Sequence, residues 1–434
     1  MDSGGDRHLA RMAYTGVSST DMFTAERSMT MNWDTVFAER TSEMKRSTVR
    51  EILKLTAKPE VISFAGGLPA PELFPVERIR QATDTILSER GNEVLQYSTT
   101  EGMPELRQLI AKRLSKGKFN ISPENILITS GSQQGVDIIA RILLDERDRV
   151  IVENPTYVGM LSSWKPYHLH FSPVPTDNDG MQVEGILPLL KDKHKLVYSI
   201  PTFQNPQGTS LTLERRERLA QILVDNDLLY VEDDPYGELR YSGEAMPTIL
   251  QTEAALRGAT DVTGNVIYCG TFSKVLTPGL RIGWIAAAFP VIDKLVQAKQ
   301  ATDLHTSTLN QFISYEVARD EEFLNSHIEH LRNVYRQRRD LMLETMAANF
   351  PEEVTWTRPE GGLFLMVTMP AKLNAAEILV KALEQNVAFV PCDAFFIGDM
   401  GHNTFRLNFS NARPEMIVEG IKRLGAVLKT AMKG

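Results

Sequence analysis

The residues best suited to chemistry surround a lysine in the segment 270–284. Lys274 follows a predicted buried strand and is flanked by the hydroxyls of Thr271 and Ser273, while Arg281 adds a permanent positive charge seven residues later. A lysine placed among such donors suits an amine that forms a Schiff base beside a bound phosphate. A single lysine in a turn is usually a surface residue, and the three neighbouring phosphate donors argue against that interpretation here.

A second group of polar residues follows the ends of two predicted strands. Asp233 comes directly after the strand predicted at 228–232, and a carboxylate there can keep a pyridine nitrogen protonated, so that the ring becomes an electron sink. Tyr236 can donate to a phenolate oxygen, and Asn205 follows the strand predicted at 196–200 as a neutral donor. Acidic strand ends also cap helices and Asn-Pro is a common turn signal, so the residues alone leave both interpretations open.

Further candidates could bind anions or a flat ring. Ser132 and Gln133 lie where a predicted strand passes into a helix, whose free N–H groups and dipole favour an anion. Tyr157 begins the next predicted helix and can stack on a ring. Arg406 lies among apolar strand residues, where a buried guanidinium needs a carboxylate, either from a ligand or from an internal ion pair.

Composition excludes several classes of protein. The 434 residues have room for two or three domains, and 42% hydrophobic against 24% charged residues predicts a folded core. The formal charge of −8, without long blocks of one sign, argues against nucleic acid as a partner. The two cysteines, Cys269 and Cys392, lack metal-ligand or disulfide-framework spacing, which predicts no metal site and favours a reducing cytoplasm. The sequence contains neither a Walker nor a Rossmann glycine pattern, which argues against a nucleotide cofactor.

Targeting and membrane signals are also missing from the sequence. No segment approaches the roughly 18–20 apolar residues of a membrane span. The first residues lack an apolar h-region, and their acidic residues are not typical of a transit peptide. We therefore expect a soluble, cytoplasmic protein with no membrane partner.

These residues need a scaffold, and from about residue 100 to residue 288 strands and helices alternate. The predicted strands are 126–129, 149–153, 196–200, 228–232 and 266–269, and the predicted helices are 104–114, 133–144, 157–165 and 213–224. Such alternation is typical of a mostly parallel sheet covered by helices. The predicted fold class is α/β.

Beyond Ala288 the pattern changes to α+β. The predicted helices are 291–300, 308–319, 322–348, 374–385 and 414–431, and the predicted strands are 353–357, 363–368, 387–390 and 404–408. Near the N-terminus, a helix at 47–56 precedes a loop in which Gly66 and Gly67 let the backbone approach another group closely. The domain prediction follows from these changes: a mobile extension (1–31), an arm joined to the small domain (32–75), a large domain (76–329) and a small α+β domain (330–434).

From about Asn32 to the C-terminus the chain resembles the fold-type I pyridoxal-phosphate enzymes of the class I/II aminotransferase family. Its motifs are most similar to the branch of 2-aminoadipate, aromatic and branched-chain aminotransferases. The residues that carry the resemblance, in the family's order and spacing, are Tyr97, Ser132, Gln133, Tyr157, Asn205, Asp233, Tyr236, Lys274, Arg281 and Arg406. The resemblance implies pyridoxal 5′-phosphate as cofactor, a helix-sandwiched parallel sheet with a small α+β domain, and ping-pong transfer of an amino group between an L-amino acid and a 2-oxo acid such as 2-oxoglutarate.

The resemblance also implies a role for each residue at the cofactor. Lys274 resembles the Schiff-base lysine, which also moves the proton between the substrate Cα and the cofactor. Asp233 resembles the partner of the pyridine nitrogen, Asn205 and Tyr236 the donors to the phenolic oxygen, and Tyr157 the stacking aromatic. The residues expected to meet the phosphate are Ser132, Gln133, Thr271, Ser273 and Arg281, with Tyr97 reaching in from a second subunit, which implies a homodimer with shared sites.

Substrate recognition is implied at both ends of the amino acid. Arg406 resembles the bidentate holder of the α-carboxylate, and Asn205, Gly66 and Gly67 are expected beside it. The segment that begins at Arg46 resembles a mobile recognition helix, in which Ser47 and Arg50 would meet a distal carboxylate. A solvated surface helix is the alternative for that segment.

Two other functions compete with transamination. The same lysine and electron sink serve lyases, decarboxylases and racemases on this scaffold. A transcription regulator with an aminotransferase-like domain would need a DNA-binding module, and only about 40 residues without a basic helix precede the recognition helix, fewer than the roughly 50 of a typical domain. Arg406 and the ketoacid half-reaction favour transamination.

Overall fold

The structure, a computed structural model, describes residues 31–44 and 60–433. Two compact units make up the chain, residues 1–41 and residues 42–434, and the architecture below belongs to the second unit. The 3-10 helices of the described residues are η1 (Trp33–Thr35), η2 (Glu39–Glu43), η3 (Pro71–Leu73), η4 (Pro123–Asn125), η5 (Lys165–Tyr167), η6 (Val183–Asp192), η7 (Pro278–Leu280) and η8 (Asp393–Phe395). The helix predicted at 47–56 and the extension predicted at 1–31, except Met31, lie outside the described residues.

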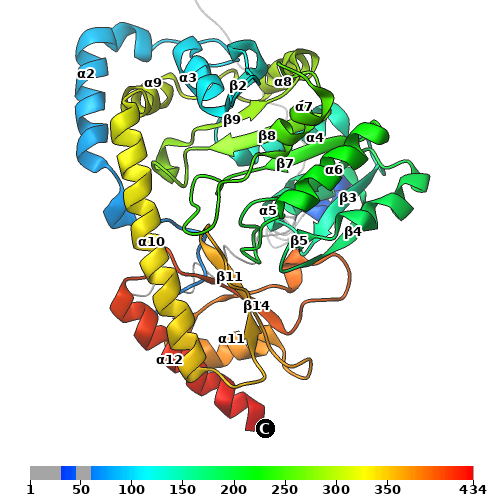
Figure 1. Cartoon of the computed structure of the whole chain (residues 1–434), viewed down its shortest axis with the longest axis vertical. Helices are drawn as coiled ribbons and strands as arrows, with labels where there is room; N and C mark the ends of the chain where they lie inside the picture. Colours follow the sequence, from blue (N-terminus) through cyan, green and yellow to red (C-terminus); the bar gives the residue numbers. More distant parts are fainter. Residues whose placement is uncertain (1–30, 45–59, 434) are drawn as a thin grey trace, which may run out of the picture. The chain divides into compact units, whose positions relative to one another are not determined.

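An eight-stranded sheet lies in the upper half of Figure 1. In chain order its strands are β2 (Ile126–Thr129), β3 (Arg149–Asn154), β4 (His170–Asp177), β5 (Gly180–Met181), β6 (Leu196–Ser199), β7 (Leu229–Asp233), β8 (Val266–Thr271) and β9 (Gly283–Ala286). They lie in the order β2-β9-β8-β7-β6-β3-β4-β5, and every pair from β8 to β4 is parallel. The predicted mostly parallel α/β sheet is confirmed.

Three strands of this sheet, β4, β5 and β9, were not predicted. Pro173 and Pro175 interrupt the strand signal of β4, and proline is tolerated there because β4 lies near the sheet edge, paired on its outer side only with the two residues of β5. β9 follows β8 with only the 3-10 helix η7 between them and runs antiparallel to both neighbours, β2 and β8, so it does not fit the strand–helix alternation on which the prediction rested.

Helices cover both faces of this sheet. The helices of the described residues are α2 (Val76–Val94), α3 (Pro104–Leu114), α4 (Ser132–Leu143), α5 (Val158–Trp164), α6 (Leu213–Asp225), α7 (Ile249–Arg257), α8 (Phe289–Asp303), α9 (Thr308–Ala318), α10 (Glu321–Asn349), α11 (Ala375–Glu384) and α12 (Pro414–Lys433). On one face, Gly135 of α4 lies against the side chains of Ile285 and Cys269. On the other, Glu232 of β7 accepts hydrogen bonds from Ile249 N and Leu250 N at the start of α7. The expected helical sandwich is therefore present.

A second, four-stranded sheet follows in the C-terminal part of the chain. Its strands are β10 (Thr355–Trp356), β11 (Phe364–Thr368), β13 (Val390–Pro391) and β14 (Thr404–Asn408), antiparallel in the order β10-β11-β14-β13. The single strand predicted at 387–390 is wrong: β12 (Val387–Ala388) pairs with β1 (Ile62–Ser63), whereas β13 pairs with β14. Phe389 lies between the two pieces.

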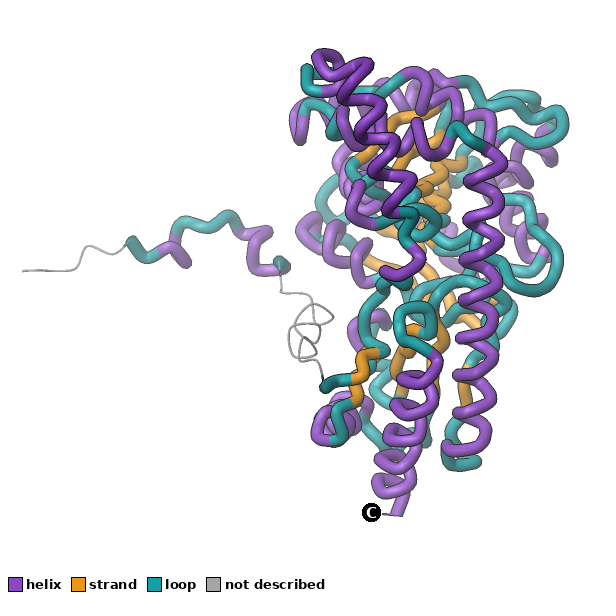
Figure 2. Tube along the Cα trace, turned by 90° about the vertical axis from the view of Figure 1, so that its left-hand side faces the viewer, coloured by secondary structure: helices purple, strands orange, loops and turns teal. Residues whose placement is uncertain are grey.

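The two sheets are separate groups of strands in Figure 2, and one long helix extends beside both. α10 packs on α9 near the first sheet and on α12 near the second. The pairing of β1 with β12 attaches the residues before β2 to the C-terminal part. The domain limits at 75/76 and 329/330 stay a prediction.

Candidate active site

Lys274 lies just beyond the end of β8, at the sheet edge where the parallel strands finish. Its Nζ donates a hydrogen bond to the carbonyl oxygen of Gly67, at 3.0 Å. Burial, together with the positive charges of Arg406 and Arg281, lowers the pKa of the Lys274 amine to about 8. The neutral, nucleophilic form of this amine is therefore much more populated than for an exposed lysine.

Asp233 ends the neighbouring strand β7 and is 2% exposed. Its Oδ2 accepts a hydrogen bond from the hydroxyl of Tyr198, at 2.7 Å, whereas Oδ1 is buried and has no hydrogen-bond partner among the described residues. Burial, with a smaller contribution from the charge of Asp234, raises the pKa of the Asp233 carboxyl to about 7, although the Tyr198 hydrogen bond opposes the rise. The free oxygen is suited to a ligand that brings a positively charged N–H group.

Arg406, at the centre of β14, is the most buried cation of the site, at 3% exposure. Its Nη1 donates to Asn205 Oδ1, at 2.7 Å, and its Nη2 donates to Ala65 O, at 2.8 Å. The ring centroids of Phe364 and Phe395 lie 4.2 and 5.4 Å from its Cζ.

No carboxylate of the described residues forms an ion pair with Arg406, and burial lowers the pKa of its guanidinium. The internal ion pair considered above is therefore not found in the described part of the chain. A buried guanidinium with only neutral partners favours an anion supplied by a ligand.

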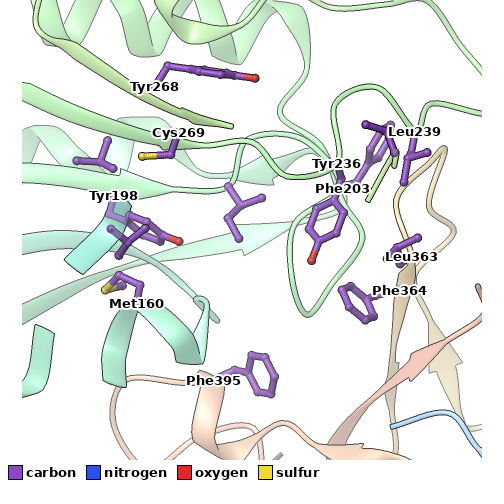
Figure 3. Close-up of a cluster of buried hydrophobic side chains, with 14 of the residues drawn as sticks. Met160, Tyr198, Phe203, Tyr236, Leu239, Tyr268, Cys269, Leu363, Phe364 and Phe395 are labelled. Atoms are coloured by element: carbon purple, nitrogen blue, oxygen red, sulfur yellow. The ribbon is translucent and has the colours of Figure 1, made fainter. Parts of the chain in front are cut away.

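Tyr236 and Asn205 connect Arg406 with Asp233. The Tyr236 ring meets Phe364 edge-on, with 5.8 Å between ring centroids, and the two face each other in Figure 3. Burial raises the pKa of the Tyr236 hydroxyl, with a hydrogen bond to Asn205 opposing the rise, so the hydroxyl stays protonated and able to donate. Because Asn205 Oδ1 is occupied by Arg406, the amide presents its N–H donors toward Tyr236 and any ligand.

An anion cradle lies at the N-terminus of α4. Gly131 caps this helix with a φ of 86°, and a side chain at position 131 would collide with the Arg281 guanidinium. Arg281 Nη2 donates to Ser130 O, at 3.2 Å, which fixes the guanidinium beside the free N–H groups of the first helical turn, starting at Ser132. Helix N–H groups and a guanidinium are typical of a phosphate site.

Two hydroxyls complete the cradle from the lysine loop. Ser273 Oγ lies 3.5 Å from Arg281 Nη1 and 3.0 Å from Thr271 Oγ1. The Thr271 hydroxyl also donates to Ile282 O, at 2.8 Å, so it is engaged within the loop, and Ser273 is the better placed of the two for a ligand.

Gln133 and Tyr157 hold one another. The Tyr157 hydroxyl donates to Gln133 Oε1, at 3.2 Å, while Gln133 Nε2 donates to Gly159 O, at 2.8 Å, and to Ser163 Oγ, at 2.7 Å. A side chain at Gly159 would overlap the Tyr157 ring, so the glycine makes room for it. The Gln133 side chain is thus used to fix the aromatic ring, which leaves its backbone N–H for an anion.

Some predicted site residues are not brought together by the described chain. Tyr97 is 78% exposed, and its ring meets only His305 edge-on, at 5.8 Å. Gly66 is buried between Ala65 and Gly67, which supply carbonyl oxygens to Arg406 and Lys274. Ser47 and Arg50 lie outside the described residues, so their predicted role is untested.

Sequence reasoning missed three residues of the site. Phe364 and Phe395 stack on Arg406, but in sequence they are ordinary apolar residues far from it. Tyr198 could have been noticed, because a tyrosine inside a fully buried strand needs a partner for its hydroxyl.

The arrangement fits pyridoxal phosphate. Lys274, Arg281 and Arg406 have no carboxylate partner among the described residues, so the site carries positive charge without matching anions. The unpaired Asp233 Oδ1 complements a protonated ring nitrogen, and the α4 cradle complements a phosphate. Residues 31–44 and 60–433 contain no group of three or more His, Cys, Asp or Glu suited to a metal ion. No helix among them is long and apolar enough to cross a membrane.

Comparison with known proteins places this site in context. Residues 59–424 match the family described as aminotransferase class I and II. The chain is 43% identical over 411 residues to aromatic-amino-acid aminotransferase 1 of Thermococcus litoralis, covering 93% of this chain and 96% of the relative. It is 41% identical over 402 residues to the 2-aminoadipate transaminase of Thermus thermophilus, covering 92% and 98%.

Solved structures agree with these relatives. The α-aminoadipate aminotransferase LysN of Thermus thermophilus, complexed with N-(5′-phosphopyridoxyl)-L-leucine, superimposes with a TM-score of 0.86 at 39% identity, over 93% of this chain and all of that one. The kynurenine aminotransferase of Pyrococcus horikoshii gives a TM-score of 0.86 at 40% identity, over 93% of this chain and 99% of that one.

Proposed function

Because the chain belongs to the class I and II aminotransferases and is a pyridoxal-phosphate-dependent transaminase, we propose that it acts on large amino acids with 2-oxoglutarate as amino acceptor. The donors proposed are 2-aminoadipate, aromatic amino acids and leucine- or valine-like amino acids, with glutamate as the donor of the reverse reaction. Two relatives are named for aromatic amino acids and 2-aminoadipate, and one solved relative is complexed with a phosphopyridoxyl derivative of L-leucine. The main support for a substrate with a carboxylate is Arg406, a buried cation whose hydrogen-bond partners among the described residues are all neutral. Lyase, decarboxylase, racemase and regulator alternatives are not favoured, since these relatives are aminotransferases.

Lys274 and Asp233 perform the central chemistry in this proposal. When bound, the cofactor supplies a ring that accepts electrons and stabilises negative charge at the substrate Cα. Lys274 binds the cofactor through Nζ and takes the proton from the substrate Cα, for which its lowered pKa keeps a neutral amine available near neutral pH. Asp233 Oδ1 holds the proton on the ring nitrogen by charge pairing.

The remaining residues bind and orient. Tyr236 and Asn205 donate toward the phenolic oxygen, and Tyr157 packs on the ring face. Arg406 holds the substrate α-carboxylate, with Asn205 and the Gly66–Gly67 backbone beside it. The phosphate is held by the cradle described above, Ser132, Gln133, Thr271, Ser273 and Arg281.

The exposed Tyr97 supports a homodimer within this proposal. Its side chain has no role in the described chain beyond the contact with His305. In a dimer the partner subunit's Tyr97 would reach the phosphate, and each active site would be shared. The expected location remains the cytoplasm, and the expected domains remain an arm, a large domain and a small domain.

Recognition of the substrate side chain is proposed to depend on Ser47 and Arg50. Glutamate and larger apolar amino acids must use one pocket, so the cation that meets a distal carboxylate has to move away for apolar side chains. The resemblance of the segment that contains these two residues to a mobile recognition helix is the support for this assignment.

A donor screen tests the function. Purified holoenzyme is given 2-oxoglutarate and one amino acid at a time, and glutamate is measured. We expect glutamate from 2-aminoadipate, aromatic and leucine-like donors, and none from Lys274→Ala under the same conditions. Release of ammonia or CO₂ in place of glutamate formation would support the lyase or decarboxylase alternative.

Replacing Arg406 with leucine should impair every donor that carries an α-carboxylate. Loss of one member of a desolvated charge pair costs roughly 2–5 kcal/mol, or about 30-fold to several thousandfold in kcat/KM. Single-turnover rates with glutamate and leucine should both fall to this extent, because both share the α-carboxylate. A primary amine without a carboxylate serves as control and should lose little. A variant that keeps full rates with both amino acids would exclude Arg406 as the carboxylate partner.

A further inference from the structure

We propose that Tyr198 is a positioning residue: it binds one oxygen of Asp233 and so presents the other, ionised, to the ring nitrogen of the cofactor. The proposal rests on the role proposed above for Asp233. Its basis is the asymmetry of that carboxyl group, in which Oδ2 accepts from the Tyr198 hydroxyl at 2.7 Å and Oδ1 has no partner among the described residues.

Tyr198 packs against a tryptophan that is itself fixed by a hydrogen bond, and this packing holds the direction of its hydroxyl. The residue is fully buried in β6, and its ring meets Trp164 of α5 edge-on, with 5.5 Å between centroids. The Trp164 indole N–H donates to Val136 O of α4, at 2.9 Å. A rigid donor fixes the rotation of the carboxyl group that accepts from it, since the second oxygen then has a defined place.

The other titratable groups near Asp233 provide no substitute for this donor. Cys269 on β8 has a raised pKa and is a neutral thiol, and Glu153 on β3 has its pKa raised to about 8 by burial. Asp234 is a further carboxylate, and Tyr236 interacts with Asn205. Among the described residues, Tyr198 is the hydrogen-bond donor that stabilises the ionised form of Asp233.

Tyr230 offers a matched control. It is also fully buried, on β7, and its hydroxyl lies 2.5 Å from Ser199 Oγ. Asp233 is three positions after Tyr230 on β7. Because side chains alternate along a strand, the two point to opposite faces of the sheet. Tyr230→Phe therefore removes a buried tyrosine hydroxyl beside the same strands without touching Asp233. Figure 3 shows two other tyrosines of this sheet, Tyr198 and Tyr268, on opposite sides of the strands.

The test measures non-covalent cofactor binding against pH. Apoenzyme is titrated with pyridoxamine 5′-phosphate, which forms no covalent bond with Lys274, for the wild type, Tyr198→Phe, Tyr230→Phe, Asp233→Asn and the double variant Tyr198→Phe/Asp233→Asn. Loss of a hydrogen bond to a charged group predicts about 10-fold weaker binding at pH 7 for Tyr198→Phe. The pH at which binding reaches half its maximum should rise by about one unit, because a carboxylate without its donor is protonated at higher pH. Tyr230→Phe should change neither quantity.

The double variant separates positioning from packing. If Tyr198 acts through Asp233, Tyr198→Phe has less than about twofold effect once residue 233 is asparagine. An equal effect in both backgrounds means that Tyr198 is merely structural, and it overturns the proposal. If Asp233→Asn weakens binding and Tyr198→Phe does not, the proposal fails while the role of Asp233 stands. If Asp233→Asn itself has no effect, the role of Asp233 fails, and that of Tyr198 with it.

Discussion

Replacing Lys274 with alanine should lower transamination by at least about 10⁴-fold while the protein still binds pyridoxal phosphate. The change removes both the nucleophile and the base, and general acid–base catalysis alone contributes about 10²–10⁴-fold. Binding should persist because Arg281, Ser273 and the α4 N-terminus hold the phosphate without the lysine. Covalent attachment should disappear.

Mass spectrometry after borohydride reduction checks this result. The wild type should gain the mass of the reduced cofactor at Lys274, and the variant should gain nothing, although dialysis still shows bound cofactor. Lys294→Ala, which removes an exposed lysine amine of α8 that donates to Gln297 Oε1, is the control and should behave as the wild type. Added methylamine should restore part of the lost rate of Lys274→Ala, since a small amine can take the proton. Near-wild-type turnover without methylamine would disprove the assignment of Lys274.

Most of the active site could be predicted because its residues follow strand ends. Asp233 is the last residue of β7 and Lys274 follows the end of β8 by three residues, and parallel strands place those ends at one edge of a sheet. Local patterns were sufficient there. The strand order that makes β7 and β8 neighbours was not predicted from the sequence, and it depends on packing of the whole unit.

The parts that escaped prediction depend on contacts between distant segments. The sequence predicted that Arg406 needs a carboxylate but left open whether a side chain of the chain or a ligand supplies it. The answer depends on which side chains the fold brings next to β14, and the sequence does not show this. The aromatic neighbours of Arg406, Phe364 and Phe395, come from two different elements, β11 and η8. Gly131 is required by the position of Arg281, 150 residues away, which no local signal reveals.

Asp233→Asn should slow the amino-acid half-reaction by about 10²–10³-fold, the usual effect of removing one electrostatic group from a buried site. Asparagine keeps the shape and the bond to Tyr198 but cannot balance a proton on the ring nitrogen. Asp234→Asn is the matched control, because Asp234 is the neighbouring, partly buried carboxylate, yet it accepts from the Tyr268 hydroxyl and from Gly237 N. Stopped-flow rates with glutamate should be within about tenfold of wild type for Asp234→Asn.

Stability of the apoenzyme gives a second, independent readout for Asp233. Its carboxyl pKa rises from 3.8 to about 7 on folding, so the folded state binds the proton more tightly than the unfolded state. This group therefore stabilises the folded apoenzyme most below pH 3.8, and the stabilisation is lost as the pH rises from 3.8 to about 7. Asparagine carries no such charge, so at pH 8 apo Asp233→Asn should unfold at a higher temperature than wild-type apoenzyme, and at pH 5 this advantage should shrink. If the half-reaction slows while the melting temperatures stay parallel across pH, Asp233 acts in catalysis without the strongly raised pKa described here. If neither changes, Asp233 is not the partner of the ring nitrogen.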